Sequence, residues 1–333
     1  MRPLTPRLAA ALRFGLGLGL VAAIVWWLLP SPQEREQLLA RLQPDPLYLL
    51  LGFLCTLAAS VVTSARWQLM SEQTMGGTRL PYVAYFHALV LTRVLGQVSS
   101  TLVMDLVGRG VALRSAGSQR DLGHAITQAI LERIFDVVLP LMMLAWAILA
   151  WQGHADATTA TASFALVCVL FAALSVVLLA PLTSLALRIH AALRRLRARR
   201  RQTSSPAEPD PAPVRLPRTL ALRVGLLSLA RYLTVLAQFW TVAIGVGVGV
   251  SFFQIAAATP LGQLAGMAGF TPGALGIQEA GWLGAFTWVG LDAVAIGLFV
   301  LSQRLISTLY FSILSLLSWL LLRRTRAATE RNR

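Results

Sequence analysis

The chain contains no lysine, and only 13% of its 333 residues are charged, about half the share usual in a soluble domain. So little charge cannot cover a soluble surface, and a hydrophobic content of 56% excludes a disordered protein. Both cysteines, Cys55 and Cys168, lie in apolar runs, so neither a disulfide framework nor a cysteine metal site is predicted. Four scattered histidines likewise predict no metal and no cofactor. These absences indicate an integral membrane protein.

Hydrophobic runs of membrane-spanning length are what the chain has instead. A crossing needs about 20 mostly apolar residues. Runs without any charged residue include 14–33, 46–65, 157–187 and 232–278, of which the last is too long for one helix. Residues 137–155 and 305–322 are further candidate spans. The sequence therefore predicts an all-α polytopic membrane protein.

The placement of arginine predicts how the chain is oriented. Of the 29 basic residues, 18 lie before residue 14, between 188 and 223, or after 322. Loops rich in arginine stay on the cytoplasmic side, so both termini and a basic loop at about 188–218 are predicted to face the cytoplasm. The linker at 151–162 lacks arginine, which places Asp156 outside and Ser204 inside. Membrane topology thus explains the net charge of +15, and no nucleic-acid partner is predicted.

Two segments must enter and leave the membrane on the same side if these orientations hold. The first, about 81–117, has Gly96, Gln97, Ser99 and Ser100 at its middle, where a continuous helix would carry apolar residues. The second, about 251–290, is centred on the stretch from Gly269 to Gly276. We predict two re-entrant helical hairpins of opposite orientation beside about six full spans, eight hydrophobic units in a single domain over 1–333. Broken helices in two halves of a chain point to a transport site.

Charged residues inside hydrophobic segments are the first candidates for that site. Each costs at least about 2.5–3.5 kcal/mol at the bilayer centre. The candidates for substrate binding are Arg93, Asp105, Arg109, Arg231, Glu279 and Arg304. Arg66 is expected to be different, because it lies at a cytoplasmic helix end from which its long side chain reaches the interface.

A separate acidic cluster lies in the segment LERIFDVVLP. Glu132 and Asp136 are four residues apart, so both carboxylates share one helix face, with Arg133 beside them. The three residues either form a structural network that holds the first hairpin to its neighbour, or they relay protons. In both cases the carboxylates are expected to pair with an arginine such as Arg93 or Arg109.

The second hairpin carries the turn TPGALGIQE. Pro272 breaks the helix, and Gly273 and Gly276 allow a tight turn with close backbone approach. A helix that begins after Gly276 would point free N–H groups at an anion, and Glu279 either caps this helix or acts as a gate. Arg231 and Arg304 are predicted either to pair with Glu279 or to bind a phosphate, because a guanidinium group suits both.

Four motifs occur in one order: Arg66-Trp67, Asp105 with Arg109, Glu132-Arg133-x-x-Asp136, and Thr-Pro-Gly-x-Leu-Gly-x-x-Glu ending at Glu279. This order resembles the lysylphosphatidylglycerol synthase transmembrane-region family, also called flippase-like domain proteins, and the flippase half of the multiple peptide resistance factor. The resemblance covers about residues 10–325. The first hairpin reads GQVSSTLVMD where the family usually has Leu-Pro-Gly and Gly-Gly-Asp, and Ala274 replaces a paired glycine. The changed loop is expected to line the site.

The resemblance implies a lipid translocase in the inner membrane of a bacterium, moving an anionic phospholipid or a polyprenyl-phosphate-linked lipid. Members that aminoacylate lipids carry a soluble transferase domain after the membrane part, and this chain stops at Arg333, so that synthase activity is not expected. The sequence contains no nucleophile–base set and no metal-ligand cluster, so no other enzyme activity is predicted. Two alternatives remain: an accessory subunit that docks an envelope glycosyltransferase, and an ion-coupled carrier of small solutes. The predicted partners are membrane lipids with an anionic head group, with an envelope-biosynthesis enzyme or a second copy of the chain as further possibilities.

Overall fold

A computed structural model describes residues 32–74, 80–115, 122–152, 157–200, 217–269 and 271–331, and these residues form helices and no strand. The predicted all-α polytopic fold is confirmed. Five of the described helices are long and apolar enough to cross a membrane: Pro46–Gln73, Ile126–Ala150, Thr158–Leu185, Arg218–Gly245 and Ala293–Thr325. The predicted span at 14–33 lies outside the described residues, so a total of six spans stays a prediction.

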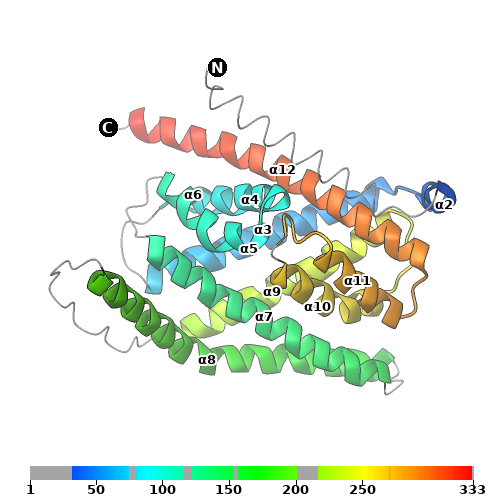
Figure 1. The fold of residues 1–333 in the computed structure, drawn as a ribbon, viewed down its shortest axis with the longest axis horizontal. Coiled ribbons are helices and arrows are strands. Elements are labelled where there is room, and N and C mark those ends of the chain that lie inside the picture. The colour runs from blue at the N-terminus through cyan, green and yellow to red at the C-terminus, as the bar shows by residue number, and fades with distance from the viewer. Residues whose placement is uncertain are drawn as a thin grey trace.

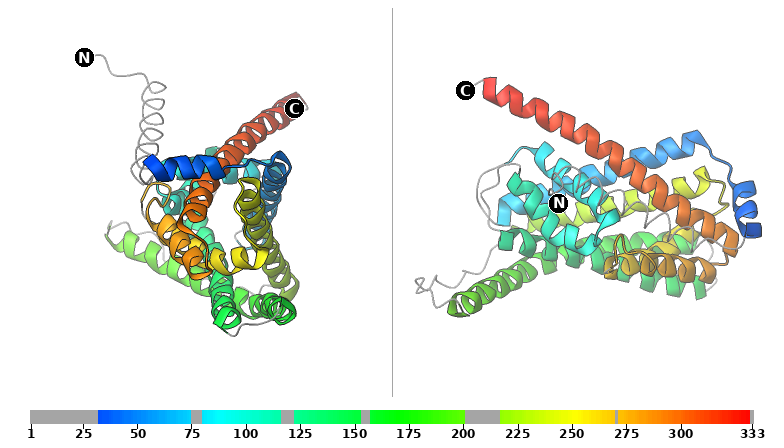
Figure 2. Two further views of the ribbon diagram at one scale, coloured as in Figure 1. Left: turned by 90° about the vertical axis from the view of Figure 1, so that its right-hand side faces the viewer. Right: turned by 45° about the horizontal axis from the view of Figure 1, so that its top comes forward.

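The long helices lie roughly along one another and surround shorter ones (Figures 1 and 2). They are α3 (Pro46–Thr74), α7 (Leu122–Gln152), α8 (Ala157–Arg200), α9 (Arg218–Gly245) and α12 (Ala293–Arg331). A short helix, α2 (Pro32–Arg41), lies across one end. Helices α3 and α9 pack antiparallel, with Gly52 facing Val242 and Gly245 facing Leu49. These glycines allow the two helices to approach closely, as small residues do in membrane helix pairs.

The first predicted hairpin is a helix pair with an irregular tip. Helix α4 (Tyr82–Val98) ends at the tip, and the chain returns through α5 (Thr101–Val103), a π-helical turn η1 (Met104–Gly108) and α6 (Arg109–Ser115). The second hairpin consists of α10 (Phe252–Ala268) and α11 (Ile277–Trp288). The 12 residues of α11 extend about 18 Å, less than the roughly 30 Å of a bilayer core. The bases of the two pairs lie toward opposite ends of the molecule (Figure 1), which fits two hairpins of opposite orientation; their re-entry into the membrane stays a prediction.

The predicted basic loop at 188–218 starts later than expected, because α8 continues through Arg200. The segment is rich in alanine, leucine and arginine, which favour helix, and residues 201–216 lie outside the described residues. Figure 1 shows the arginine-bearing ends of α8 and α12 at the same end of the molecule. That common end is consistent with one arginine-rich membrane face.

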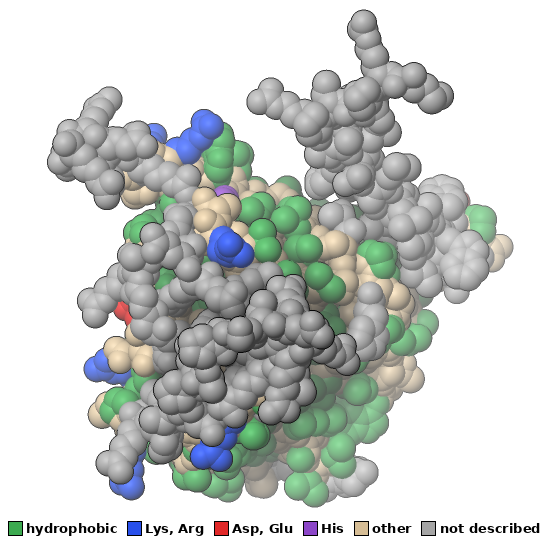
Figure 3. Space-filling model, turned by 60° about the vertical axis from the view of Figure 1, so that its left-hand side comes forward, with side chains coloured by type: hydrophobic (Ala, Val, Ile, Leu, Met, Phe, Trp, Pro, Cys, Tyr) green, Lys and Arg blue, Asp and Glu red, His purple; other side chains and the backbone are tan. Residues whose placement is uncertain are grey.

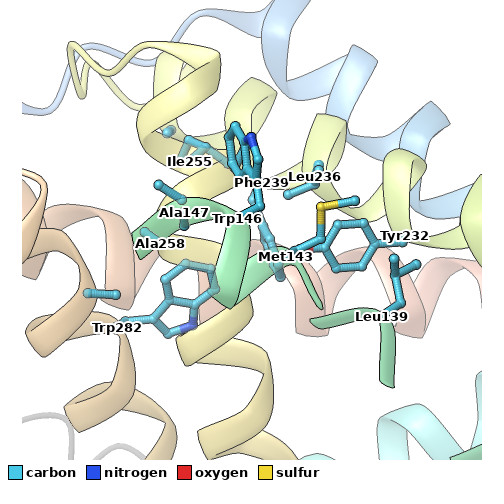
Figure 4. Packing of buried hydrophobic residues seen from close by; sticks show 14 of the residues in the cluster. Leu139, Met143, Trp146, Ala147, Tyr232, Leu236, Phe239, Ile255, Ala258 and Trp282 are labelled. Carbon is cyan, nitrogen blue, oxygen red and sulfur yellow. The ribbon is translucent and has the colours of Figure 1, made fainter. Parts of the chain in front are cut away.

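The main hydrophobic core joins α7, α9, α10 and α11 (Figure 4). Trp282 of α11 stacks on Phe286 and meets the ring of Phe239 edge-on, with centroids 5.0 Å apart. Gly262 of α10 leaves the room that the Trp282 indole fills. This packing fixes the second hairpin against the long helices.

The outer surface is apolar as well. Leu166, Val169 and Val177 of α8 are each more than half exposed, and Figure 3 shows hydrophobic side chains over much of the described surface on that view. Exposed apolar side chains on a helix of spanning length are suited to contact with lipid.

Candidate functional site

The tips of the two hairpins meet directly. The backbone N–H of Gly273 donates to the carbonyl oxygen of Ser99 at 2.8 Å, and Ser100 and Pro272 form an isolated antiparallel bridge. The polar and glycine residues that interrupt each helical pattern therefore serve a common purpose: they bring extended backbone from two distant segments together. The two tips therefore lie together and can form the walls of one site between the hairpins, as predicted.

Asp105 is the centre of the charge network beside this junction. It lies in η1, and its carboxylate accepts hydrogen bonds from Arg133 at 2.5 Å, Arg109 at 3.1 Å and Arg93 at 3.5 Å. The π-helical turn places Arg109 four residues on, where it reaches back to Asp105. One buried carboxylate thus holds three guanidinium groups from three separate helices.

Arg66 is buried within the second part of the network, and the prediction that it reaches the membrane interface is wrong. Its guanidinium group donates to both oxygens of Asp136, at 2.7 and 3.1 Å, and lies 3.7 Å from Glu132. Asp136 also accepts from Arg231 at 3.2 Å, and Glu132 accepts from Arg109 at 3.1 Å. The two carboxylates, one turn apart on α7, draw Arg66 inward, because a buried carboxylate needs a paired cation.

The expected pairing of the acidic cluster is therefore confirmed for Glu132 with Arg109, whereas Asp136 pairs with Arg66 and Arg231 instead. Arginine donates to both oxygens of Asp136, and Glu132 accepts from Arg109 at one oxygen and from the amide of Gln128 at the other. This arrangement favours the structural interpretation of Glu132 and Asp136 over a proton relay, because a relay needs a carboxylate that can accept a proton.

The network holds more positive than negative charge. Its members are the arginines 66, 93, 109, 133 and 231 and the carboxylates 105, 132 and 136. Five cations against three anions leave a net charge of +2 when all are ionised. Arg66 and Arg109 are buried in the packing, while the side chains of Arg93, Arg133 and Arg231 are 27%, 19% and 12% exposed. The surplus charge thus lies on the accessible side.

Arg304 ties the second hairpin to α12. One of its guanidinium nitrogens pairs with the Glu279 carboxylate, and another donates to the carbonyl oxygen of Gly273 at 2.6 Å. The second oxygen of Glu279 accepts the backbone N–H of Gly276 at 2.7 Å. Glu279 is therefore a helix cap and the partner of Arg304 at once.

The N–H groups of the turn itself, from Gly273 to Gly276, are all bonded within the protein and are not free for an anion. Gly273 donates to Ser99, and Ala274 and Leu275 donate to Thr271 and Pro272 within the turn, at 2.9 and 3.1 Å. Glu279 takes the N–H of Gly276. A tight turn satisfies its own N–H groups, so the arginine side chains are left to supply the positive charge.

A cavity of about 220 Å³ lies where the hairpin tips, α3, α7, α9 and α12 come together. Its charged lining residues are Arg93, Asp105, Arg133, Arg231, Glu279 and Arg304. The predicted substrate-binding residues that line it are Arg93, Asp105, Arg231, Gly273, Glu279 and Arg304, whereas Arg109 and Gly276 do not. Arg133, which was assigned to the structural cluster, also lines it. The sequence prediction therefore brings most of one site together from segments far apart in the chain.

Neutral polar residues of the cavity were missed. They include Gln238, Gln263, Gln278 and Gln303, whose amides lie on α9, α10, α11 and α12. Three of the four stand in or beside the long uncharged run, where an isolated glutamine is as informative as a charge, since a buried amide needs partners. Attention to formal charge alone overlooked that signal.

The described residues thus form a helical membrane domain in which two hairpins meet at an arginine-lined cavity. A model of the lysylphosphatidylglycerol synthase TM region matches residues 14–315. Comparisons with curated proteins and with solved structures gave no match. The match spans most of the chain and contains every charged residue of the cavity, so this protein belongs to the lysylphosphatidylglycerol synthase transmembrane-region family.

Proposed function

We propose that this protein moves an anionic lipid across the membrane and that the cavity between the hairpins binds the phosphate of its head group. The observation that carries the proposal is the net charge of +2 in the network around Asp105, with Arg93, Arg133 and Arg231 on the cavity wall. A surplus of buried cations is costly at membrane depth. A phosphate would neutralise it, and guanidinium groups bind phosphate with two-point geometry.

Only a head group fits inside. The cavity volume of about 220 Å³ is below the roughly 300–1,000 Å³ of sites that enclose drug-sized ligands. The acyl chains would remain in the surrounding lipid while the head group passes between the hairpin tips. A phosphate entering the cavity would compete with Asp105 for Arg93 and Arg133, and with Glu279 for Arg304, so that the arginines exchange one anion for another without being left unpaired.

We propose further that the protein is not an enzyme, that it resides in a bacterial inner membrane and that both termini face the cytoplasm. Asp156 and Ser204, which report on this topology, lie outside the described residues. In a variant with Cys55 and Cys168 replaced by alanine, a cysteine at 156 should be labelled by an impermeant maleimide in intact cells, and a cysteine at 204 only after lysis. Labelling of position 204 from outside would overturn the orientation.

The transport proposal is tested with purified protein in phosphatidylcholine liposomes that contain an acyl-labelled phosphatidylglycerol. Translocation is measured as the rate at which the label becomes accessible to an impermeant quencher. Arg93→Gln and Arg231→Gln should each slow translocation at least about tenfold, the effect of losing one charge-assisted contact of about 1.5–3 kcal/mol. Arg223→Gln is the matched control, because Arg223 is exposed on the same helix as Arg231 and does not line the cavity. If both cavity variants move the lipid at the parental rate, the proposal is wrong, and an accessory-subunit role becomes the better account.

A further inference from the structure

The uncharged part of the cavity wall is rich in amides and hydroxyls. Its polar neutral residues are Ser60, Thr63, Gln97, Thr101, Gln238, Gln263, Gln278, Gln303 and Ser307. A phosphate alone makes no use of most of these groups, because the arginines already match its oxygens. The amide and hydroxyl groups of the remaining wall therefore point to a second part of the ligand beside the phosphate.

Three of these groups are buried without a hydrogen-bond partner in the protein: Thr101 Oγ1, Gln263 Oε1 and Gln303 Oε1. They come from the first hairpin, the second hairpin and α12, and all three residues line the same cavity. Buried polar atoms are normally paired, and an unpaired one calls for a specific explanation. A ligand that binds there supplies one.

The hydrogen-bonding character of these unpaired atoms determines which groups the ligand must carry. The amide oxygens of Gln263 and Gln303 accept hydrogen bonds and cannot donate them. A phosphate diester has only acceptors, so it cannot satisfy them. The part of the ligand that lies against these glutamines must carry O–H or N–H donors.

An ammonium group would be the wrong donor in this position. The neighbouring arginine network already has a surplus of positive charge, which repels a further cation. A phosphate diester lowers this surplus from +2 only to +1. While it binds Arg93, Arg133 and Arg304, Asp105 keeps Arg109 and Glu279 keeps the N–H of Gly276. Uncharged donors remain, and the hydroxyls of a polyol or sugar are the simplest of these.

The two halves of the wall are close enough to bind one head group. Gln303 directly precedes Arg304 on α12, and Thr101 lies one helical turn before Asp105. The side chain of Gln303 is held in place by its own bond to Ser307, in which its amide nitrogen donates at 2.8 Å. A phosphate on the arginines would therefore have its substituent beside these groups.

We propose that the ligand is a lipid phosphate whose head group carries an uncharged polyol or sugar, and that Thr101, Gln263 and Gln303 bind its hydroxyls. This inference rests on the proposed function, since it names the lipid class that the same cavity takes. It also predicts that a lipid with an aminoacylated, cationic head group is a poor ligand for this chain.

The test compares four lipids with identical labelled acyl chains in phosphatidylcholine liposomes: phosphatidic acid, phosphatidylglycerol, phosphatidylinositol and lysylphosphatidylglycerol. The parental protein should bind and move the two hydroxylated anionic lipids better than phosphatidic acid, although phosphatidic acid bears at least as much negative charge. It should bind lysylphosphatidylglycerol least. This comparison needs no variant, so it cannot be lost to misfolding.

Variants then assign the preference to residues. Gln263→Leu and Gln303→Leu should each weaken binding of phosphatidylinositol about three- to tenfold, the effect of one hydrogen bond, and leave phosphatidic acid unchanged. Gln37→Leu, an exposed glutamine on α2, is the matched control. Equal binding of phosphatidic acid and the hydroxylated lipids by the parental protein, or tightest binding of lysylphosphatidylglycerol, would overturn the inference and leave the proposed function standing. Failure to bind any of the three anionic lipids would overturn the proposed function itself.

Discussion

The backbone N–H of Gly273 donates to the carbonyl oxygen of Ser99 at 2.8 Å, and through this bond the tips of two hairpins from opposite halves of the chain touch. The carbonyl oxygen of Gly273 in turn accepts from Arg304. A single glycine thus connects the first hairpin, the second hairpin and α12 at the edge of the cavity. Its φ of 59° lies in the left-handed region, which few residues other than glycine adopt readily.

Gly273→Ala should therefore separate the hairpin tips. The new Cβ would lie 2.8 Å from the carbonyl oxygen of Gln97, and the left-handed backbone costs a further 1–2 kcal/mol or so. We expect a lower melting temperature in detergent and slower lipid movement. Gly284→Ala is the control, because a Cβ at that position meets nothing within 4 Å. Equal melting temperatures for the two variants would show that the tip contact contributes nothing.

Arg66→Met should destabilise the fold more than Arg133→Met. Arg66 is 1% exposed and donates to both oxygens of Asp136, so removing it leaves Asp136 with a single bond from Arg231. Breaking a buried ion pair costs on the order of 3–5 kcal/mol. Arg133 is partly open to the cavity, and Asp105 retains Arg93 and Arg109 without it. The measurement is the yield of folded protein and its thermal unfolding in detergent.

At matched folded protein, the Arg133 variant should instead lose affinity for anionic lipid. Parental stability of Arg66→Met would contradict the structural role given to the Asp136 pair. Parental lipid binding by Arg133→Met would remove Arg133 from the site.

Glu279→Gln should strengthen the binding of anionic lipid. The amide oxygen of glutamine can still cap the N–H of Gly276, while the loss of the carboxylate frees the charge of Arg304 for a phosphate. Tighter binding with slower turnover is expected, because release then lacks a competing carboxylate. Glu279→Ala serves as the control that also removes the cap, at a cost of about 0.5–2 kcal/mol. Unchanged affinity in Glu279→Gln would show that Glu279 and a lipid do not compete for Arg304.

The hairpins could be predicted from sequence because polar and glycine residues interrupt otherwise apolar helical patterns, and such interruptions are confined to few places in a membrane domain. The positions Ser99–Ser100 and Thr271–Gly276 mark the tips as the structure has them. The sequence predicts one site between the two hairpins, but not the hydrogen bond that joins their tips, because nothing in the local pattern of either segment specifies that contact.

In the charge network too, local spacing could be predicted from sequence, whereas contacts between distant segments could not. The spacing of Glu132 and Asp136 predicted that both carboxylates face one way, and the structure agrees. The burial of Arg66 was missed, since a position at the end of a hydrophobic run is usually an interface. The packing of α3 against α9, together with the carboxylates of α7, makes it an interior position. The amides were missed for a different reason: only formal charges were considered, although a glutamine within an uncharged run already indicates a buried polar group that needs a partner.

A last prediction concerns pH and the end of the molecule away from the arginine-rich face. Asp292 precedes the final span, and the N–H of Ala295 donates to its carboxylate at 3.0 Å; this bond, together with Arg41 of α2 at 2.8 Å, lowers the pKa of Asp292 below its ordinary value of 3.8. A carboxyl group with a lowered pKa in the folded state stabilises the fold above pH 3.8 and ceases to do so as the pH falls through the folded-state value.

Asp292→Asn should therefore reduce the melting temperature near neutral pH, and the difference from the parental protein should shrink progressively below about pH 3.8. Asparagine still caps the helix, so the variant measures the contribution of the carboxylate charge alone. The side chain of Asp292 is 58% exposed, which limits the effect to less than about 1 kcal/mol, and added salt should reduce it by screening the pair. A difference that is the same in acid as at neutral pH, or that salt leaves unchanged, would mean that the contact between α2 and α12 depends on packing and not on this ion pair.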